Sequence, residues 1–88
     1  MTCRIDRRLT EQGLILNVSG RLAAEELEVV RIALDAGRVI AIELAEIEVV
    51  SRDAVKLLVQ AETEGIELRS CPAYIRKWIA NERESSQR

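Results

Sequence analysis

The alternation of apolar and polar residues divides the chain into segments with the periods of strands and helices. Residues 39–44 (VIAIEL) are almost wholly apolar and rich in β-branched side chains. Such a run predicts a strand that helices bury on both faces. After residue 51 the period changes, because apolar residues recur three and four positions apart from Ala54 to Ala61. This spacing predicts an amphipathic helix that begins close to the end of the buried strand.

Two strands and a helix are predicted before the buried strand. Residues 3–9 alternate between charged and apolar positions, which predicts a half-exposed strand at a sheet edge, where charges discourage pairing with other chains. Residues 14–18 return as a second strand after a turn at Gly13. Residues 20–22 close this hairpin and lead into a helix from about Ala23 to Ala36, with apolar residues along one face.

The remaining residues complete a repeating pattern of strands and helices. Gly65 ends the second helix, residues 66–69 alternate as a short strand, and Pro72 suits the first position of a final helix. The order β-β-α-β-α-β-α predicts a single small α/β domain with a four-stranded mixed sheet, strand order 1-2-3-4, first strand antiparallel, and three helices. We place this domain at residues 1–80 and a polar, fraying tail at residues 81–88.

Composition narrows the classes of function. With 88 residues the chain forms one domain, and its 48% hydrophobic content supplies an aliphatic core. The 13 basic and 15 acidic residues are interspersed, so no basic face suggests nucleic-acid binding. Charged residues interrupt every apolar run well before the roughly 18 residues of a membrane-spanning helix, and no signal peptide is evident. We therefore expect a cytoplasmic protein that neither binds nucleic acid nor inserts into a membrane.

Residues that carry most enzymatic chemistry are scarce. The chain has no His, the commonest general base and metal ligand, and Cys3 and Cys71 form no CxxC pair. We expect no enzymatic activity, no metal and no cofactor. Cys71 is open to two interpretations: a reactive thiol at the start of the last helix, or a small buried residue.

Three stretches resemble, in order, elements of the STAS family (sulfate transporter and anti-sigma factor antagonist domains). LILNVSGRLAAEELEVVRIAL resembles the second strand and first helix of such domains, joined by a Ser-Gly-Arg-Leu-type turn. VIAIELAEIEVVSRDAVKLL resembles their buried strand, followed by an apolar stretch and the Asp-Ser-Ser-Gly motif that opens the second helix. GIELRSC resembles their last strand, and the likeness extends from about Cys3 to Ile79.

The resemblance implies a STAS-like fold and a non-enzymatic interaction module. In the anti-sigma factor antagonists of this family, a partner serine kinase phosphorylates one Ser of the motif, and the phosphate ends binding. A phosphate there gains contacts with the helix N-terminus, yet it places about two negative charges in an interface.

This sequence departs from the motif at the phosphorylated position. Without gaps, Ser51 aligns with the motif Asp, Arg52 with the first Ser, Asp53 with the phosphorylated Ser and Ala54 with the Gly. Asp53 is no substrate for a serine kinase, so it is either a fixed negative charge or the mark of an abandoned site. A small loop difference would instead make Ser51 the acceptor. From the residues alone, Ser51 caps the helix and Asp53 complements its dipole.

We therefore expect a partner, a regulatory protein kinase or ATPase of the anti-sigma type, at the corner formed by Ser51, Arg52 and Asp53. Val50, Ala54 and Lys56 are the expected partner-binding residues beside it. Two alternatives stay open: a subunit of a membrane-transport ATPase assembly, and a nucleotide or small-molecule sensor with a cleft near Glu46 and Asp53. A homodimer also stays open.

Overall fold

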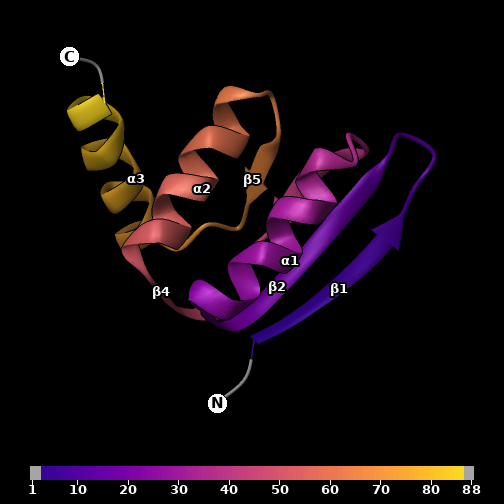
Figure 1. Ribbon diagram of the computed structural model, residues 1–88, viewed down its shortest axis with the longest axis horizontal. Coiled ribbons are helices and arrows are strands. Elements are labelled where there is room, and N and C mark those ends of the chain that lie inside the picture. Colours follow the sequence, from indigo (N-terminus) through magenta and orange to yellow (C-terminus); the bar gives the residue numbers. More distant parts are fainter. Residues whose placement is uncertain (1–2, 87–88) are drawn as a thin grey trace.

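The hairpin predicted at the start of the chain is present in the computed structural model, which describes residues 3–86 (Figure 1). Strand β1 (Cys3–Leu9) pairs antiparallel with β2 (Leu14–Leu22). The main chains of Thr10 and Gly13 exchange hydrogen bonds across the turn. Strand β2 is longer than predicted, because the segment expected to close the hairpin continues in the sheet. Gly20, at φ 83°, lies where the pairing register shifts and the strand bends.

The strand order of the prediction is confirmed, but the number of strands is not. Strand β3 (Val39–Glu43) pairs parallel with β2, and β5 (Glu67–Arg69) pairs parallel with β3, giving the order β1-β2-β3-β5. The fifth strand, β4 (Ile47–Val50), pairs parallel with the end of β2. Because β2 extends past β3, its main-chain groups there need another partner, and β4 supplies it. The four-stranded prediction is therefore wrong by this one short strand.

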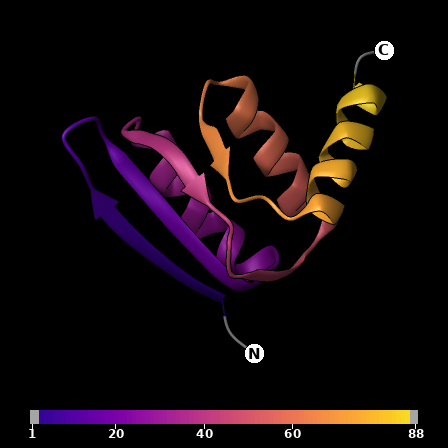
Figure 2. The same ribbon diagram turned by 180° about the vertical axis from the view of Figure 1, so that it is seen from behind.

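Helices α1 (Ala24–Asp35) and α2 (Arg52–Thr63) cover one face of the sheet, not two as the apolar run suggested (Figures 1 and 2). These two helices lie side by side across the sheet, and α3 (Ala73–Ser86) packs beside α2. Seen from behind, the strands lie in front and no helix crosses them (Figure 2). Within residues 3–86, the opposite face of the sheet therefore carries no helix, and we call it the open face (Figure 2).

Apolar residues of β2 and β3 are nevertheless buried on the open face. Ile15 is 4% exposed and Ala41 is 0% exposed. Arg8 of β1 lies opposite Ile15, and Glu67 of β5 lies opposite Ala41, so long charged side chains flank both. The stems of such side chains cover apolar surface while their charges stay in water. This cover explains why an almost wholly apolar strand is stable without a second helical layer.

The core on the helical face is aliphatic and includes residues from all three helices. Leu16, Ile42, Leu58, Ile75 and Ile79 are each at most 1% exposed. Within the described residues, no polar or charged residue is buried.

Helix α3 is joined to the domain by polar contacts as well as by its apolar face. Glu62 of α2 accepts hydrogen bonds from Arg76 and Arg83, each at 2.9 Å. The Tyr74 hydroxyl donates to the main-chain carbonyl of Glu48 at 2.6 Å. The helix extends to Ser86, so residues 81–86, expected in a fraying tail, are helical; residues 87 and 88 lie outside the described part.

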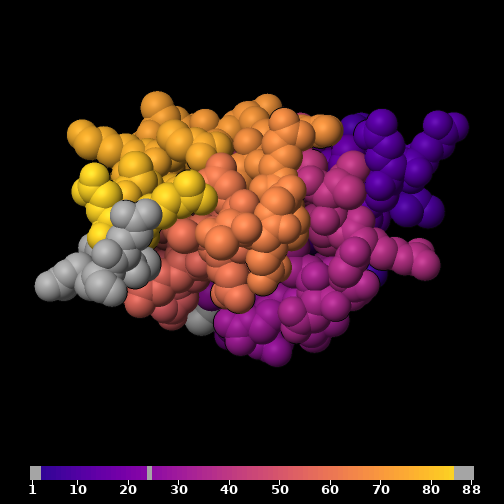
Figure 3. All heavy atoms as spheres, turned by 90° about the horizontal axis from the view of Figure 1, so that it is seen from above, coloured from indigo at the N-terminus to yellow at the C-terminus, as the bar shows by residue number. Residues whose placement is uncertain are grey.

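Viewed from above, β1 and α3 occupy opposite ends of the molecule (Figure 3). Within residues 3–86, none of the helices combines the length and the apolar character needed to cross a membrane.

Candidate functional site

Ser51 forms the corner between β4 and α2, and its predicted role as a helix cap is confirmed. Its backbone is extended (φ −85°, ψ 168°), and its Oγ accepts a hydrogen bond from the Ala54 amide at 3.1 Å. The Ser51 amide donates to the Leu22 carbonyl at 3.0 Å, which ties the corner to the end of β2. The corner is therefore held by the sheet on one side and by its own cap on the other.

Arg52 and Asp53 follow in the first turn of α2, and both are exposed. The Arg52 guanidinium pairs with the Glu82 carboxylate, Nε to Oε2 at 3.2 Å, and so turns toward α3. Asp53 instead lies on the side of α1, where it lines a hollow between the two helices together with Lys56. The corner thus presents an ion-paired cation toward α3 and a carboxylate toward α1.

Two of the expected partner-binding residues lie beneath this surface. Val50 is 5% exposed and Ala54 is 0% exposed, because both belong to the core under α2. Lys56 is exposed. A partner at this corner would meet Arg52, Asp53 and Lys56, while Val50 and Ala54 support them from below.

A hollow of about 410 Å³ lies beside the corner, between the ends of β2 and β4 and the start of α1. Val49 lines it and is 47% exposed. Arg21 of β2 and Glu25 of α1 also line this hollow. Sequence reasoning missed Val49, although the doublet Val49-Val50 in a strand places one side chain in the core and the next outside it.

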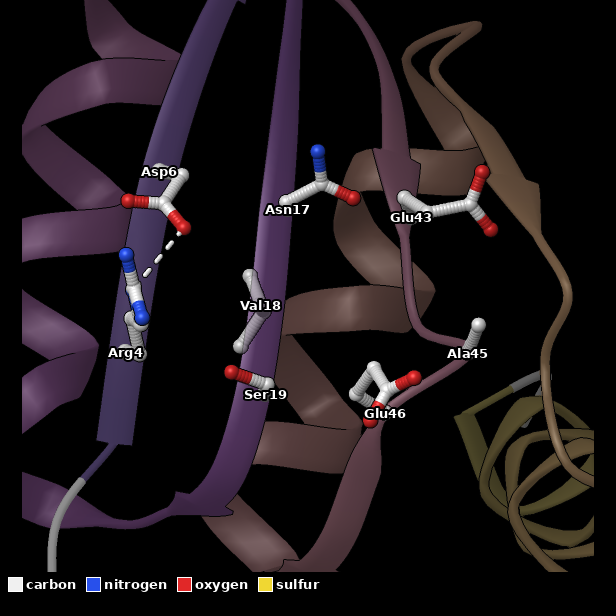
Figure 4. A pocket seen from close by; sticks show the side chains of 8 residues that line it. All are labelled: Arg4, Asp6, Asn17, Val18, Ser19, Glu43, Ala45 and Glu46. Atoms are coloured by element: carbon white, nitrogen blue, oxygen red, sulfur yellow. Dashed lines mark ion pairs between the residues drawn. The ribbon is translucent and has the colours of Figure 1, made fainter.

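A second hollow, of about 300 Å³, lies on the open face of the sheet (Figure 4). Arg4 and Asp6 contribute from β1 and form an ion pair at 3.1 Å. Asn17 lines it from β2 and Glu43 from β3, and Figure 4 shows the Glu43 carboxylate turned away from Asn17. The Glu43 Oε1 atom is buried, and no hydrogen-bond partner for it is present among the described residues.

The sequence contained a signal for this second hollow. Arg4 and Asp6, like Asn17 and Ser19, are two residues apart in a strand and therefore share a face. All four line the hollow.

The single cleft expected near Glu46 and Asp53 does not form. Glu46 lines the hollow on the open face, whereas Asp53 lines the hollow between α1 and α2 on the opposite side of the sheet. Glu46 lies in the turn between β3 and β4, whereas Asp53 belongs to α2, which packs against the other face of the sheet.

The cysteines are both free and partly buried. Burial raises the pKa of the Cys71 thiol, and the nearby Arg76 only partly opposes this. Burial, followed by the Glu26 carboxylate, raises the pKa of the Cys3 thiol. A raised pKa reduces the thiolate fraction at neutral pH, so Cys71 matches the interpretation as a small, partly buried residue better than that of a reactive thiol.

Within the described part of the chain, no three Cys, Asp or Glu side chains are placed to hold a metal ion. Comparison with known protein families, with curated proteins and with solved structures gives no match for this chain.

Proposed function

We propose that this chain is a non-enzymatic interaction module of the STAS type, which binds a regulatory kinase or ATPase through the corner at the start of α2. The observation that supports this best is that exposed charges and an exposed apolar side chain occur together at this corner. A rigid capped turn presents Asp53 and Lys56 in water, next to a hollow in which Val49 is half exposed. Protein interfaces commonly combine an apolar anchor with a polar, charged rim.

The capped geometry also supports a fixed-charge role for Asp53 in place of a phosphate switch. The Ser51 hydroxyl is already used as the helix cap, because its Oγ accepts the hydrogen bond of the Ala54 amide. Asp53 places a carboxylate in the first turn of α2, where the helix dipole favours a negative charge. On this proposal Asp53 supplies a permanent single negative charge, and partner binding is not ended by a kinase.

The test is a quantitative pull-down from a lysate of the source organism, with mass spectrometry of the retained proteins. Wild type is compared with Lys56→Glu and with Val49→Lys, and Lys77→Glu on α3, which reverses the charge of another exposed lysine, is the matched control for the first. We expect a kinase or ATPase to be retained by wild type and the control, and retained about tenfold less by the two corner variants. Equal retention by all four proteins would contradict the proposed surface.

Phosphorylation is tested separately with ATP and the retained kinase. We expect no added phosphate on wild type and stoichiometric phosphate on Asp53→Ser. A phosphate mapped to Ser51 of the wild-type protein would show that Asp53 does not replace the acceptor.

The hollow beside Val49 also favours the second candidate function, a nucleotide or small-molecule sensor. Its volume of about 410 Å³ is within the range of small-ligand pockets. A thermal shift assay with nucleotides separates the two proposals. If millimolar ligand leaves the melting temperature unchanged, the sensor proposal is rejected. A transport ATPase retained in the pull-down would instead support the alternative of a transport-assembly subunit.

A further inference from the structure

Strand β1 has one edge that no other described strand pairs with. Within residues 3–86 it pairs only with β2, and it forms one end of the molecule (Figures 1 and 3). Thr10 and Gly13 exchange main-chain hydrogen bonds, so every second residue before Thr10 bonds to β2 in the same way. The residues between them turn their N–H and C=O groups to the free edge: Cys3, Ile5, Arg7 and Leu9.

Two exposed apolar side chains lie on the side of the molecule that carries this edge. Leu9 of β1 is 71% exposed, and Val29 of α1 is 46% exposed. Arg31 faces α2 across their shared hollow, and Val29 is about 160° from it around the helix axis. Figure 1 places β1 on the side of α1 that faces away from α2. Leu9 and Val29 therefore both lie toward the end of the molecule that β1 forms (Figure 1).

We propose that two copies of this chain associate through the β1 edge, antiparallel and related by a twofold axis, to form one continuous sheet. The unpaired main-chain groups of β1 supply the hydrogen bonds, as in other cases of strand addition. The same arrangement brings α1 of both copies to one side of the joined sheet.

The charges of β1 select one register for this pairing. In a twofold antiparallel pair, the central residue lies opposite its own copy. A centre at Arg4, Asp6, Arg7 or Arg8 would place like charges in contact. A centre at Ile5 instead places Arg4 of each copy opposite Asp6 of the other, and it aligns residues that all have free main-chain groups.

The register centred on Ile5 also extends an ion pair that is already present. Arg4 and Asp6 lie on the open face of β1, at 3.1 Å, with side chains that are 78% and 56% exposed (Figure 4). In the dimer, each cation would lie between two carboxylates, one from each copy. The alternating charges of β1, which discourage pairing with a strand of unrelated sequence, are thus complementary to those of a second copy of β1.

Sedimentation velocity on the full chain over a dilution series tests the proposal. We expect wild type to reach twice the 9.9 kDa chain mass at high concentration. Asp6→Arg should weaken association by at least about tenfold, because Arg4 then faces Arg. The swap Arg4→Asp/Asp6→Arg should restore it, and Asp35→Arg at the end of α1 is the control with the same charge change and no expected effect.

A variant of the main chain gives a second readout. Arg7→Pro removes an N–H that points to the free edge, so it should abolish the dimer while circular dichroism shows an intact fold. A wild type that stays monomeric throughout would overturn the proposal. So would a dimer that is equally stable in Asp6→Arg, Arg7→Pro and Asp35→Arg.

Discussion

The Ser51 cap connects local sequence to global stability, and its removal can be predicted quantitatively. Ser51→Ala deletes one hydrogen bond, the 3.1 Å contact between Oγ and the Ala54 amide, and leaves that amide without its side-chain acceptor. Loss of such a cap costs about 1 kcal/mol. The first turn of α2 cannot fray freely, because Ala54 and Val55 in it are each 0% exposed. The cost should therefore appear in the global free energy of unfolding and not only as local fraying.

For a domain of this size, about 1 kcal/mol corresponds to a fall in melting temperature of roughly 4–8 °C. The assay is urea unfolding followed by circular dichroism, together with thermal unfolding. We expect a lower urea midpoint with an unchanged slope, because the surface exposed on unfolding stays the same. Ser51→Asp keeps an acceptor at the cap and should remain within about 0.3 kcal/mol of wild type.

Helix α1 offers the reciprocal experiment. It begins after Ala23, whose backbone is extended but which makes no side-chain cap. Ala23→Ser would place a hydroxyl three residues before Glu26, the spacing of a capping box, and should raise stability by about 0.5–1 kcal/mol. A loss below about 0.3 kcal/mol for Ser51→Ala, combined with no gain for Ala23→Ser, would refute the reasoning from caps.

Two further predictions concern α3 and its surroundings. Glu62→Gln removes two ion pairs, to Arg76 and Arg83, whose cations are 46% and 44% exposed, so the loss should be modest, about 0.5–1.5 kcal/mol. Urea unfolding measures this loss, with Glu28→Gln as the control. High salt should reduce the difference in unfolding free energy between wild type and Glu62→Gln, and a difference that does not depend on salt would argue against an ionic origin. Burial raises the pKa of the Cys71 thiol in the folded protein. The protonated thiol should therefore contribute its full stability below the unfolded-state pKa of about 8.5, and this contribution should be lost as the pH rises through the folded-state pKa. The melting temperatures of wild type and Cys71→Ser should therefore converge as the pH rises, and a constant difference would contradict the raised pKa.

Local signals in the sequence determined most of the elements. Period and capping chemistry located α2, since Ser51 at its start and Gly65 after its end are read within a few residues of chain. The strand order followed from the succession of elements, because parallel strands joined by helices permit few arrangements. The function stays a prediction from the resemblance, and the site residues stay a proposal.

Only the tertiary structure decided which side of each element meets solvent. Residues 39–43 are apolar enough for burial on both faces, yet on the open face that burial comes from side chains of the flanking strands and not from helices. Strand β4 exists because β2 continues beyond β3 and needs a partner there, a requirement that no local pattern encodes. Val50 and Ala54 were expected at the partner-binding surface, yet both belong to the core, because segments distant in the chain pack over them. Sequence period gives the faces of an element, whereas the neighbours that cover those faces are set by packing between segments distant in the chain.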